Sequence, residues 1–193
     1  MEPTQLVSDV QRLTESLGQL PEPVAEPMFI AVSGLPGTGK SYFCNQLAKR
    51  LPLVILESDA LRKALFSSPS YNPQESSHLF RAVHLLIERL LKRGVSLILD
   101  ATNLSERYRE YLYSIADHLG VKLVLVRVEA PPQIVYERLK SRQGNSQDKS
   151  DADWTVYQKM KSSVQHIRRN HYAVDTSRDI TPVLDKIARE VRH

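Results

Sequence analysis

The chain has 193 residues, of which 41% are hydrophobic and 25% are charged, and its formal net charge is +4. This length and composition are typical of one globular domain with or without a short extension. Cys44 is the only cysteine, which excludes an intrachain disulfide and disfavours a zinc site. The sequence shows no signal peptide and no apolar run near the roughly 18 residues of a membrane span, so we expect a cytoplasmic protein.

Residues 4–20 are predicted to form an amphipathic helix. Its apolar side chains recur at spacings of three or four: Val7, Val10, Leu13, Leu17 and Leu20. Residues 21–27 contain three prolines, which end the helix and form a stiff connector. The helix either packs back on the main domain, which we favour, or docks a partner or a second copy. We therefore expect an extension, 1–27, and a domain, 28–193.

From Met28 onward, predicted strands alternate with predicted helices. Apolar runs predict buried strands at 28–33, 53–57, 95–100, 121–128 and, more briefly, 172–175. Helices are predicted at 40–50, 59–66, 74–93, 105–118, 132–142, 153–170 and 181–191. This alternation indicates an α/β fold, in which a parallel sheet is covered by helices on both faces. In such folds the ligands bind beyond the carboxyl ends of the strands.

Residues 34–41, Gly-Leu-Pro-Gly-Thr-Gly-Lys-Ser, fit the phosphate-binding loop between a strand and a helix. Glycines let backbone N–H groups turn inward around a polyphosphate, and the helix N-terminus adds the positive end of its dipole. Lys40 would reach the β- and γ-phosphates, and the Ser41 hydroxyl would hold Mg²⁺. The residues expected to contact the nucleotide are Gly34, Gly37, Thr38, Gly39, Lys40 and Ser41. The sequence thus predicts binding of a nucleoside triphosphate, with ATP favoured.

Strand 95–100 ends in Asp100, where P-loop proteins hold Mg²⁺ through its water shell. The next residue is Ala101, whereas motor-type ATPases usually carry a water-activating Glu there. The chain also has no Asn-Lys-x-Asp motif for reading guanine. These two absences disfavour a hydrolytic motor and a GTPase, and they favour a phosphotransferase.

Strand 53–57 leads into Asp59 and Arg62, which are one helical turn apart on the same face. The Asp59 carboxylate can accept a proton from an acceptor hydroxyl, and Arg62 can hold an anionic group of that acceptor. A helix cap at Asp59 and a surface ion pair between the two residues remain equally open from the spacing alone.

Arg138 and Arg142 share one face of the predicted helix 132–142 and precede the polar segment 143–151. A flap of this kind can carry arginines over the phosphates, neutralise the transferred phosphoryl group and exclude water. Without the other motifs, a solvated helix face would be the preferred interpretation of this arginine pair.

Residues 28–193 resemble the small P-loop kinases that include polynucleotide 5′-hydroxyl kinases and zeta-toxin-like kinases. The resemblance rests on Gly34-x4-Gly39-Lys40-Ser41, Ser58-Asp59-x2-Arg62, Leu99-Asp100-Ala101-Thr102-Asn103, Arg138-x3-Arg142 and Ser150-Asp151-Ala152. It implies a P-loop NTPase fold: a five-stranded parallel sheet of order 2-3-1-4-5, with an arginine-bearing lid and an N-terminal helical extension. It also implies ATP and Mg²⁺ as ligands.

The same resemblance implies a role for each matched residue. Lys40 and Ser41 would bind the donor phosphates and Mg²⁺, with Asp100 on the metal side. Asp59 would be the general base and Arg62 would hold a phosphate of the acceptor. The lid arginines that stabilise the transition state would be Arg138 and Arg142. Residues 174–177, which include Thr176, would contact the adenine.

The sequence therefore predicts an ATP:hydroxyl phosphotransferase whose acceptor is a 5′-OH nucleic-acid end or a small molecule such as a sugar, nucleoside or antibiotic. The Asp59-x2-Arg62 match puts the nucleic-acid end slightly ahead, although residues 64–93 show no dense basic track. Two other classes stay open. One is a slow nucleotide-dependent switch that acts through residues 1–27, and the other is an ATP-binding module whose acceptor site has decayed.

Overall fold

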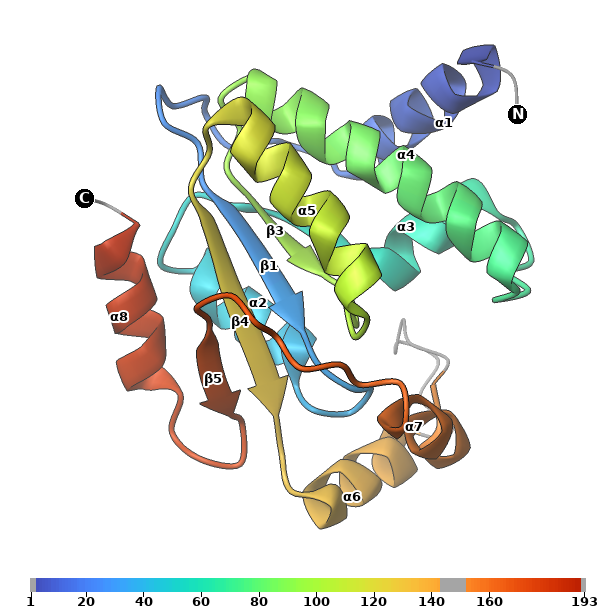
Figure 1. Ribbon diagram of the computed structural model, residues 1–193, viewed down its shortest axis with the longest axis vertical. Coiled ribbons are helices and arrows are strands. Elements are labelled where there is room, and N and C mark those ends of the chain that lie inside the picture. The colour runs from blue at the N-terminus through green and yellow to red at the C-terminus, as the bar shows by residue number, and fades with distance from the viewer. Residues whose placement is uncertain (1–2, 143–151, 192–193) are drawn as a thin grey trace.

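Five parallel strands form the centre of the fold in the computed structural model, which describes residues 3–142 and 152–191 (Figure 1). The strands are β1 (Phe29–Ser33), β2 (Val54–Glu57), β3 (Leu97–Asp100), β4 (Leu123–Glu129) and β5 (Tyr172–Asp175). Their order is β2-β3-β1-β4-β5, which confirms the predicted sheet. Asp100 is in register with Val32 of β1 and Glu57 of β2, so the carboxyl ends of these three strands lie together.

Helices cover both faces of the sheet (Figure 1). One layer contains α1 (Pro3–Ser16), α3 (Ser58–Leu65), α4 (Pro73–Lys92) and α5 (Glu106–Leu119). The opposite layer contains α2 (Lys40–Ala48) and α8 (Thr181–Glu190). Beyond the carboxyl end of β4 lie α6 (Pro132–Arg142) and α7 (Trp154–Lys161).

Two apolar cores follow from the alternation of side chains along the strands. In β1, Phe29 and Ala31 point into the core under α4 and α5, whereas Ile30 and Val32 point into the core under α2 and α8. Both pairs are almost fully buried, as expected for a strand that is covered on its two faces. β1 therefore holds the phosphate loop, which follows it directly, on a rigid support.

Helix α1 packs on the main domain. Its Val10 and Leu13 are fully buried in the core that α4 also lines, and α1 contacts both α3 and α4. Asp9, only 2% exposed, accepts a bond from the ring of His78 on α4 at 2.7 Å, and Arg12 donates to carbonyls at the end of α3. Of the two alternatives for this helix, packing is the one observed. A boundary at residue 27 and a partner for the exposed face of α1 stay predictions.

The predicted helix 153–170 was wrong in its second half. Helix α7 ends at Lys161, and residues 162–171 run back toward β5 without regular structure. The backbone N–H of Gln165 donates to the Leu104 carbonyl at 2.9 Å, and Ile167 is 5% exposed, so tertiary contacts replace the helical bonds here.

The predicted flap, 143–151, lies outside the described residues. Within the described residues, no helix is long and apolar enough to span a membrane.

Candidate functional site

The phosphate loop lies between β1 and α2, as predicted, and three glycines shape it. Gly37 and Gly39 have φ angles of 76° and 93°, a region that other residues enter only with strain. A Cβ atom at Gly34 would stand 2.3 Å from the Val128 carbonyl oxygen, and one at Gly39 would stand 2.9 Å from the Thr176 hydroxyl. The loop is therefore packed closely against β4 and the segment after β5, with no room for side chains at these positions.

Lys40 begins α2 and its ammonium group turns back over the loop. Nζ donates to the Leu35 carbonyl at 3.1 Å, and the Thr38 hydroxyl donates to the same carbonyl at 2.8 Å. Burial lowers the pKa of Lys40, because it disfavours the charged ammonium. The carboxylates of Asp100 and Asp59 raise this pKa, whereas the positive charge of Arg142 lowers it further. Side chains from β3, α3 and α6 thus act on one ammonium group.

Asp100 lies at the carboxyl end of β3 and is 3% exposed. Its Oδ2 atom has no hydrogen-bond partner among the described residues. Buried carboxylate oxygens normally have hydrogen-bond partners. This oxygen is therefore suited to binding a cation, either directly or through a water molecule. Ser41, on the first turn of α2 directly after the phosphate loop, is exposed. These two residues suit Mg²⁺, which prefers oxygen ligands and keeps several waters.

The two residues that follow Ala101 tie β3 to the phosphate loop. The Thr102 carbonyl accepts the N–H of Gly34 at 3.0 Å, and the Asn103 side-chain amide donates to the Val32 carbonyl at 2.7 Å. Asn103 is one of two non-glycine residues with a positive φ, 45°, among the residues that the structure describes. The sequence motif included these two residues, but their structural role was not predicted.

Arg138 and Thr176 meet beside the phosphate loop. The Arg138 guanidinium donates to the Thr176 hydroxyl at 2.8 Å and to the Thr176 carbonyl at 3.0 Å, and it approaches the Gly37 carbonyl at 3.5 Å. The Thr176 hydroxyl in turn donates to the Thr38 carbonyl at 2.5 Å. The structure therefore places Arg138 against the loop and Arg142 within electrostatic reach of Lys40. The spacing of the two arginines did not predict this difference.

Arg62 is buried in an ion pair with Glu75 of α4. The two charged atoms are 2.5 Å apart and each side chain is 8% exposed. The Arg62 guanidinium also lies over the ring of Tyr71, with 4.7 Å to the centroid. Burial opposes ionisation of Glu75, but hydrogen bonds from Ser70 and Arg62 lower its pKa to about 2. Glu75 is 13 residues away in sequence, and its pairing with Arg62 was not predicted.

Comparison with known protein families matches residues 29–167 to a family described as an AAA domain. Because the match spans more than half of the chain, the chain belongs to this AAA domain family. The matched residues include the phosphate loop, β3, α3 and α6, which carry most of the site described above, whereas Thr176 lies beyond them.

Known proteins agree with this fold. The chain is 28% identical over 116 residues to L-seryl-tRNA(Sec) kinase from Methanococcus maripaludis, and this match covers 58% of the chain but only 44% of that protein. It also resembles a putative kinase from Chloroflexus aurantiacus, with a TM-score of 0.68 at 20% identity, over 86% of this chain and 96% of that one. APS kinase from Mycobacterium tuberculosis, in complex with AMPPNP and APS, gives a TM-score of 0.65 at 15% identity, over 89% and 100%. At these identities the structural likeness shows the P-loop kinase fold.

Proposed function

We propose that this protein transfers the γ-phosphate of ATP to a hydroxyl group of an acceptor. The observation that carries the proposal is the arrangement around Lys40. A buried ammonium on the phosphate loop lies within electrostatic reach of two carboxylates and an arginine, which come from three different elements. A phosphoryl-transfer site needs this combination: cations for the transferred group, a carboxylate for the metal and a carboxylate for the attacking hydroxyl.

In the proposed reaction, the oxygen of the acceptor hydroxyl forms a bond to the γ-phosphorus while Asp59 accepts the proton of that hydroxyl. The bond from that phosphorus to the bridging oxygen breaks, and ADP leaves. Lys40 and Arg142 stabilise the negative charge on the phosphoryl oxygens during transfer. Ser41 and Asp100 would hold Mg²⁺, which neutralises phosphate charge when it is bound.

Arg138 is proposed to act on the donor side of the site. Because it binds Thr176 and reaches the Gly37 carbonyl, it holds the phosphate loop against the segment after β5. Thr176 follows β5, where we propose that the adenine lies. In this assignment the two arginines share one helix but have different tasks, nucleotide positioning for Arg138 and charge stabilisation for Arg142.

For the acceptor, we propose a hydroxyl that is carried by a nucleic acid, most simply a 5′-OH end. Two observations support this choice: the Asp59-x2-Arg62 pattern and the similarity to a kinase named for L-seryl-tRNA(Sec). A small-molecule acceptor is the second candidate, supported by the likeness to an APS kinase in complex with APS. In either case the acceptor would approach Asp59 at the start of α3.

The test is the transfer of labelled γ-phosphate from ATP to a panel of acceptors. The panel contains 5′-OH DNA, 5′-OH RNA, seryl-tRNA, nucleosides, sugars and antibiotics. Labelling of a 5′-OH end or of seryl-tRNA supports the nucleic-acid acceptor, and labelling of a sugar or nucleoside alone supports the second candidate. ATP binding without labelling of any acceptor would contradict the proposed phosphotransfer.

Asp59→Asn is the variant that tests the mechanism. It removes the proton acceptor but keeps the size and polarity of the side chain, so ATP should bind with nearly unchanged affinity. We expect the transfer rate to fall by roughly 10²- to 10⁴-fold. Wild-type transfer by Asp59→Asn would remove Asp59 from the mechanism.

Arg62→Lys tests the acceptor-side role that the resemblance implies. The substitution keeps the positive charge near Glu75 but loses the planar guanidinium that suits a phosphate group. We expect the KM for the acceptor to rise more than the KM for ATP. A loss of stability with both KM values unchanged would instead assign Arg62 to the packing of α3 against α4.

A further inference from the structure

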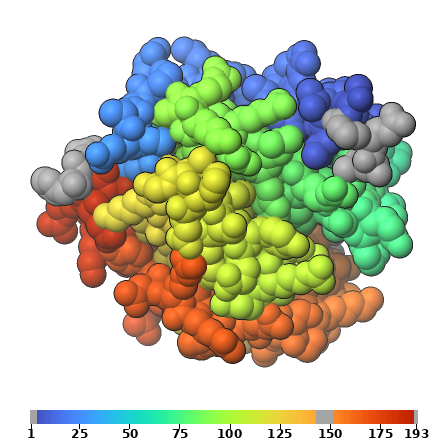
Figure 2. All heavy atoms as spheres, turned by 45° about the horizontal axis from the view of Figure 1, so that its top comes forward, coloured from blue at the N-terminus to red at the C-terminus, as the bar shows by residue number. Residues whose placement is uncertain are grey.

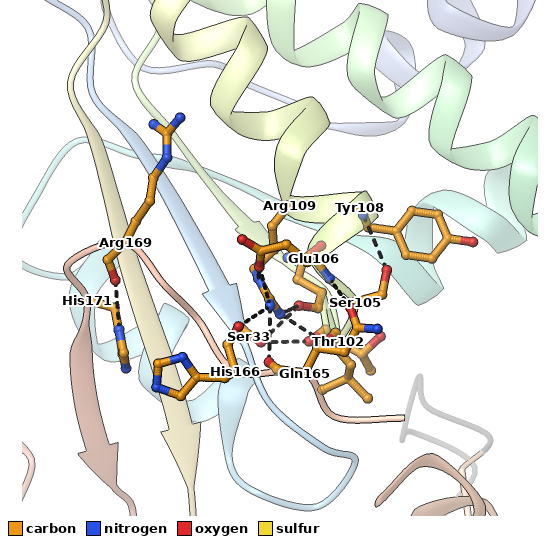
Figure 3. A network of polar contacts seen from close by, with 12 residues as sticks. Ser33, Thr102, Ser105, Glu106, Tyr108, Arg109, Gln165, His166, Arg169 and His171 are labelled. Atoms are coloured by element: carbon orange, nitrogen blue, oxygen red, sulfur yellow. Dashed lines mark hydrogen bonds and ion pairs between the residues drawn. The ribbon is translucent and has the colours of Figure 1, made fainter. Parts of the chain in front are cut away.

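Arg109, on the first turn of α5, lies at the centre of a buried polar network (Figure 3). Its side chain is 1% exposed, and the Glu106 carboxylate balances its charge at 2.6 Å. Its guanidinium also donates to four backbone carbonyls at 2.8–3.0 Å, those of Asn103, Leu104, Gln165 and His166. One side chain thus joins two segments that are about sixty residues apart in the sequence.

The first of these segments follows Asp100 and is already attached to the phosphate loop. The Ser33 hydroxyl donates to the carbonyls of Thr102 and Asn103, both at 3.1 Å, and the N–H of Gly34 donates to the Thr102 carbonyl. Arg109 therefore holds the same short segment, and it shares the Asn103 carbonyl with Ser33. A shift of residues 103–104 would be transmitted to the loop and to the metal-side carboxylate.

The second segment, 162–171, connects α7 to β5 and lies beside α5 (Figure 2). Gln165 is fixed there twice more, since its N–H donates to the Leu104 carbonyl and its side chain accepts the N–H of Glu106 at 2.6 Å. Helix α7 packs on α6 through a small apolar cluster that contains Tyr157, Val135 and Leu139. The position of α6, and with it Arg142, is thereby linked to residues 165–166.

We propose that Arg109 is a positioning residue for phosphotransfer: it sets where α6 and α7 stand relative to Asp100 and the phosphate loop. This inference rests on the proposed function. It extends the proposed function to a side chain that bonds to residues 103–104 and 165–166 and, within the described residues, forms no hydrogen bond with residues 34–41. A displacement of about 1 Å at a reacting centre can lower a rate by roughly 10²-fold, so a small loosening of this link is measurable.

Arg109→Lys tests the link with little change of charge. Lysine has three donors on one nitrogen and lacks the planar fork, so it cannot hold both pairs of carbonyls together. Arg169→Lys is the matched control. Arg169 lies on the same segment, is 46% exposed and pairs with Asp117 at 3.1 Å. Within the part of the chain that the structure describes, it forms no hydrogen bond with residues 103–104.

The measurements are the dissociation constant of a fluorescent ATP analogue, kcat for phosphotransfer to the acceptor found in the panel, and hydrogen exchange of residues 163–168. For Arg109→Lys we expect kcat to fall about tenfold or more, nucleotide affinity to stay within about threefold, and exchange at 163–168 to rise. For Arg169→Lys we expect wild-type values of kcat and affinity. An unchanged kcat in folded Arg109→Lys would overturn the proposal, as would parallel losses of kcat and nucleotide affinity.

Gln165→Ala is the second variant, needed if Arg109→Lys does not fold. It removes only the bond to the Glu106 N–H, so it should lower kcat by a smaller factor than Arg109→Lys and leave nucleotide affinity unchanged. An unchanged kcat counts against the link.

If the wild-type protein transfers phosphate to no acceptor, the proposed function fails by itself. The link is then tested by hydrogen exchange alone. If the ATP analogue slows exchange at residues 163–168 in the wild type but not in Arg109→Lys, the link is supported. If it slows exchange equally in both proteins, the link is overturned.

Discussion

Replacing Thr176 by valine isolates the support that one hydroxyl gives to the phosphate loop. This buried hydroxyl donates to the Thr38 carbonyl at 2.5 Å and accepts from the Arg138 guanidinium at 2.8 Å. Valine has nearly the same shape but makes neither bond. A neutral hydrogen bond contributes about 1 kcal/mol net and one to a charged group about 2 kcal/mol. Since Arg138 keeps its bond to the Thr176 carbonyl, part of the second contribution survives, and we expect the free energy of unfolding to fall by about 2 kcal/mol.

Thr176→Ser is the matched control, because it keeps the hydroxyl and removes only a methyl group. Its loss should be about 1 kcal/mol or less, the value for one buried carbon. Urea unfolding measures both variants, and titration with a fluorescent ATP analogue measures whether the loop still binds nucleotide. The affinity should fall more for valine than for serine, and by no more than about 30-fold, since 1.4 kcal/mol corresponds to tenfold. Equal unfolding free energies for the two variants would refute the assigned role of the hydroxyl.

Two further predictions concern His84 on α4 and Gly37 in the phosphate loop. Burial lowers the pKa of His84 from 6.5 to about 4, so the folded state takes up its proton later than the unfolded state as the pH falls. Stability from His84 is therefore present above pH 6.5 and is lost as the pH falls toward 4. Urea unfolding should show about 2 kcal/mol less stability at pH 5 than at pH 7, a difference that His84→Gln reduces and His118→Gln, at an exposed position, does not. Gly37→Ala would place a Cβ 2.9 Å from Leu139 on α6, whereas Gly120→Ala shares the positive φ and meets nothing within 4 Å. Both should lose about 1 kcal/mol of stability from backbone strain, but only Gly37→Ala should also weaken nucleotide binding; equal binding by the two would contradict the packing of α6 on the loop.

The sheet and the phosphate loop could be predicted because their determinants are local. β1 and β3 are short apolar runs, and each is followed within a few residues by the polar groups that act at its carboxyl end. The order of the strands followed from the family resemblance, and the structure confirms it. In contrast, residues 162–170 were predicted as a helix, because nothing in their own sequence shows that Gln165 pairs with Leu104.

The partners of two buried arginines were equally inaccessible from the sequence. Arg62 pairs with Glu75 across the loop between α3 and α4, and Arg109 binds carbonyls that belong to residues 165–166. Carbonyl acceptors are present at every residue, so sequence patterns carry no information about which of them a guanidinium will find. Such contacts depend on the packing of elements that are far apart in the chain.

Arg138 and Arg142 show how far the spacing argument reaches. Residues four apart on a helix lie on one face, but they are separated by about 6 Å along its axis, since the helix rises 1.5 Å per residue. Arg138 bonds to Thr176 and approaches the Gly37 carbonyl, whereas Arg142 acts on the ammonium group of Lys40. A triphosphate that follows the loop toward Lys40 spans a comparable length. Side chains on one helix face can therefore act at both ends of the triphosphate. The spacing correctly predicted one helix for both arginines, and the separate tasks proposed for them follow from the groups that Arg138 bonds to and that Arg142 acts on.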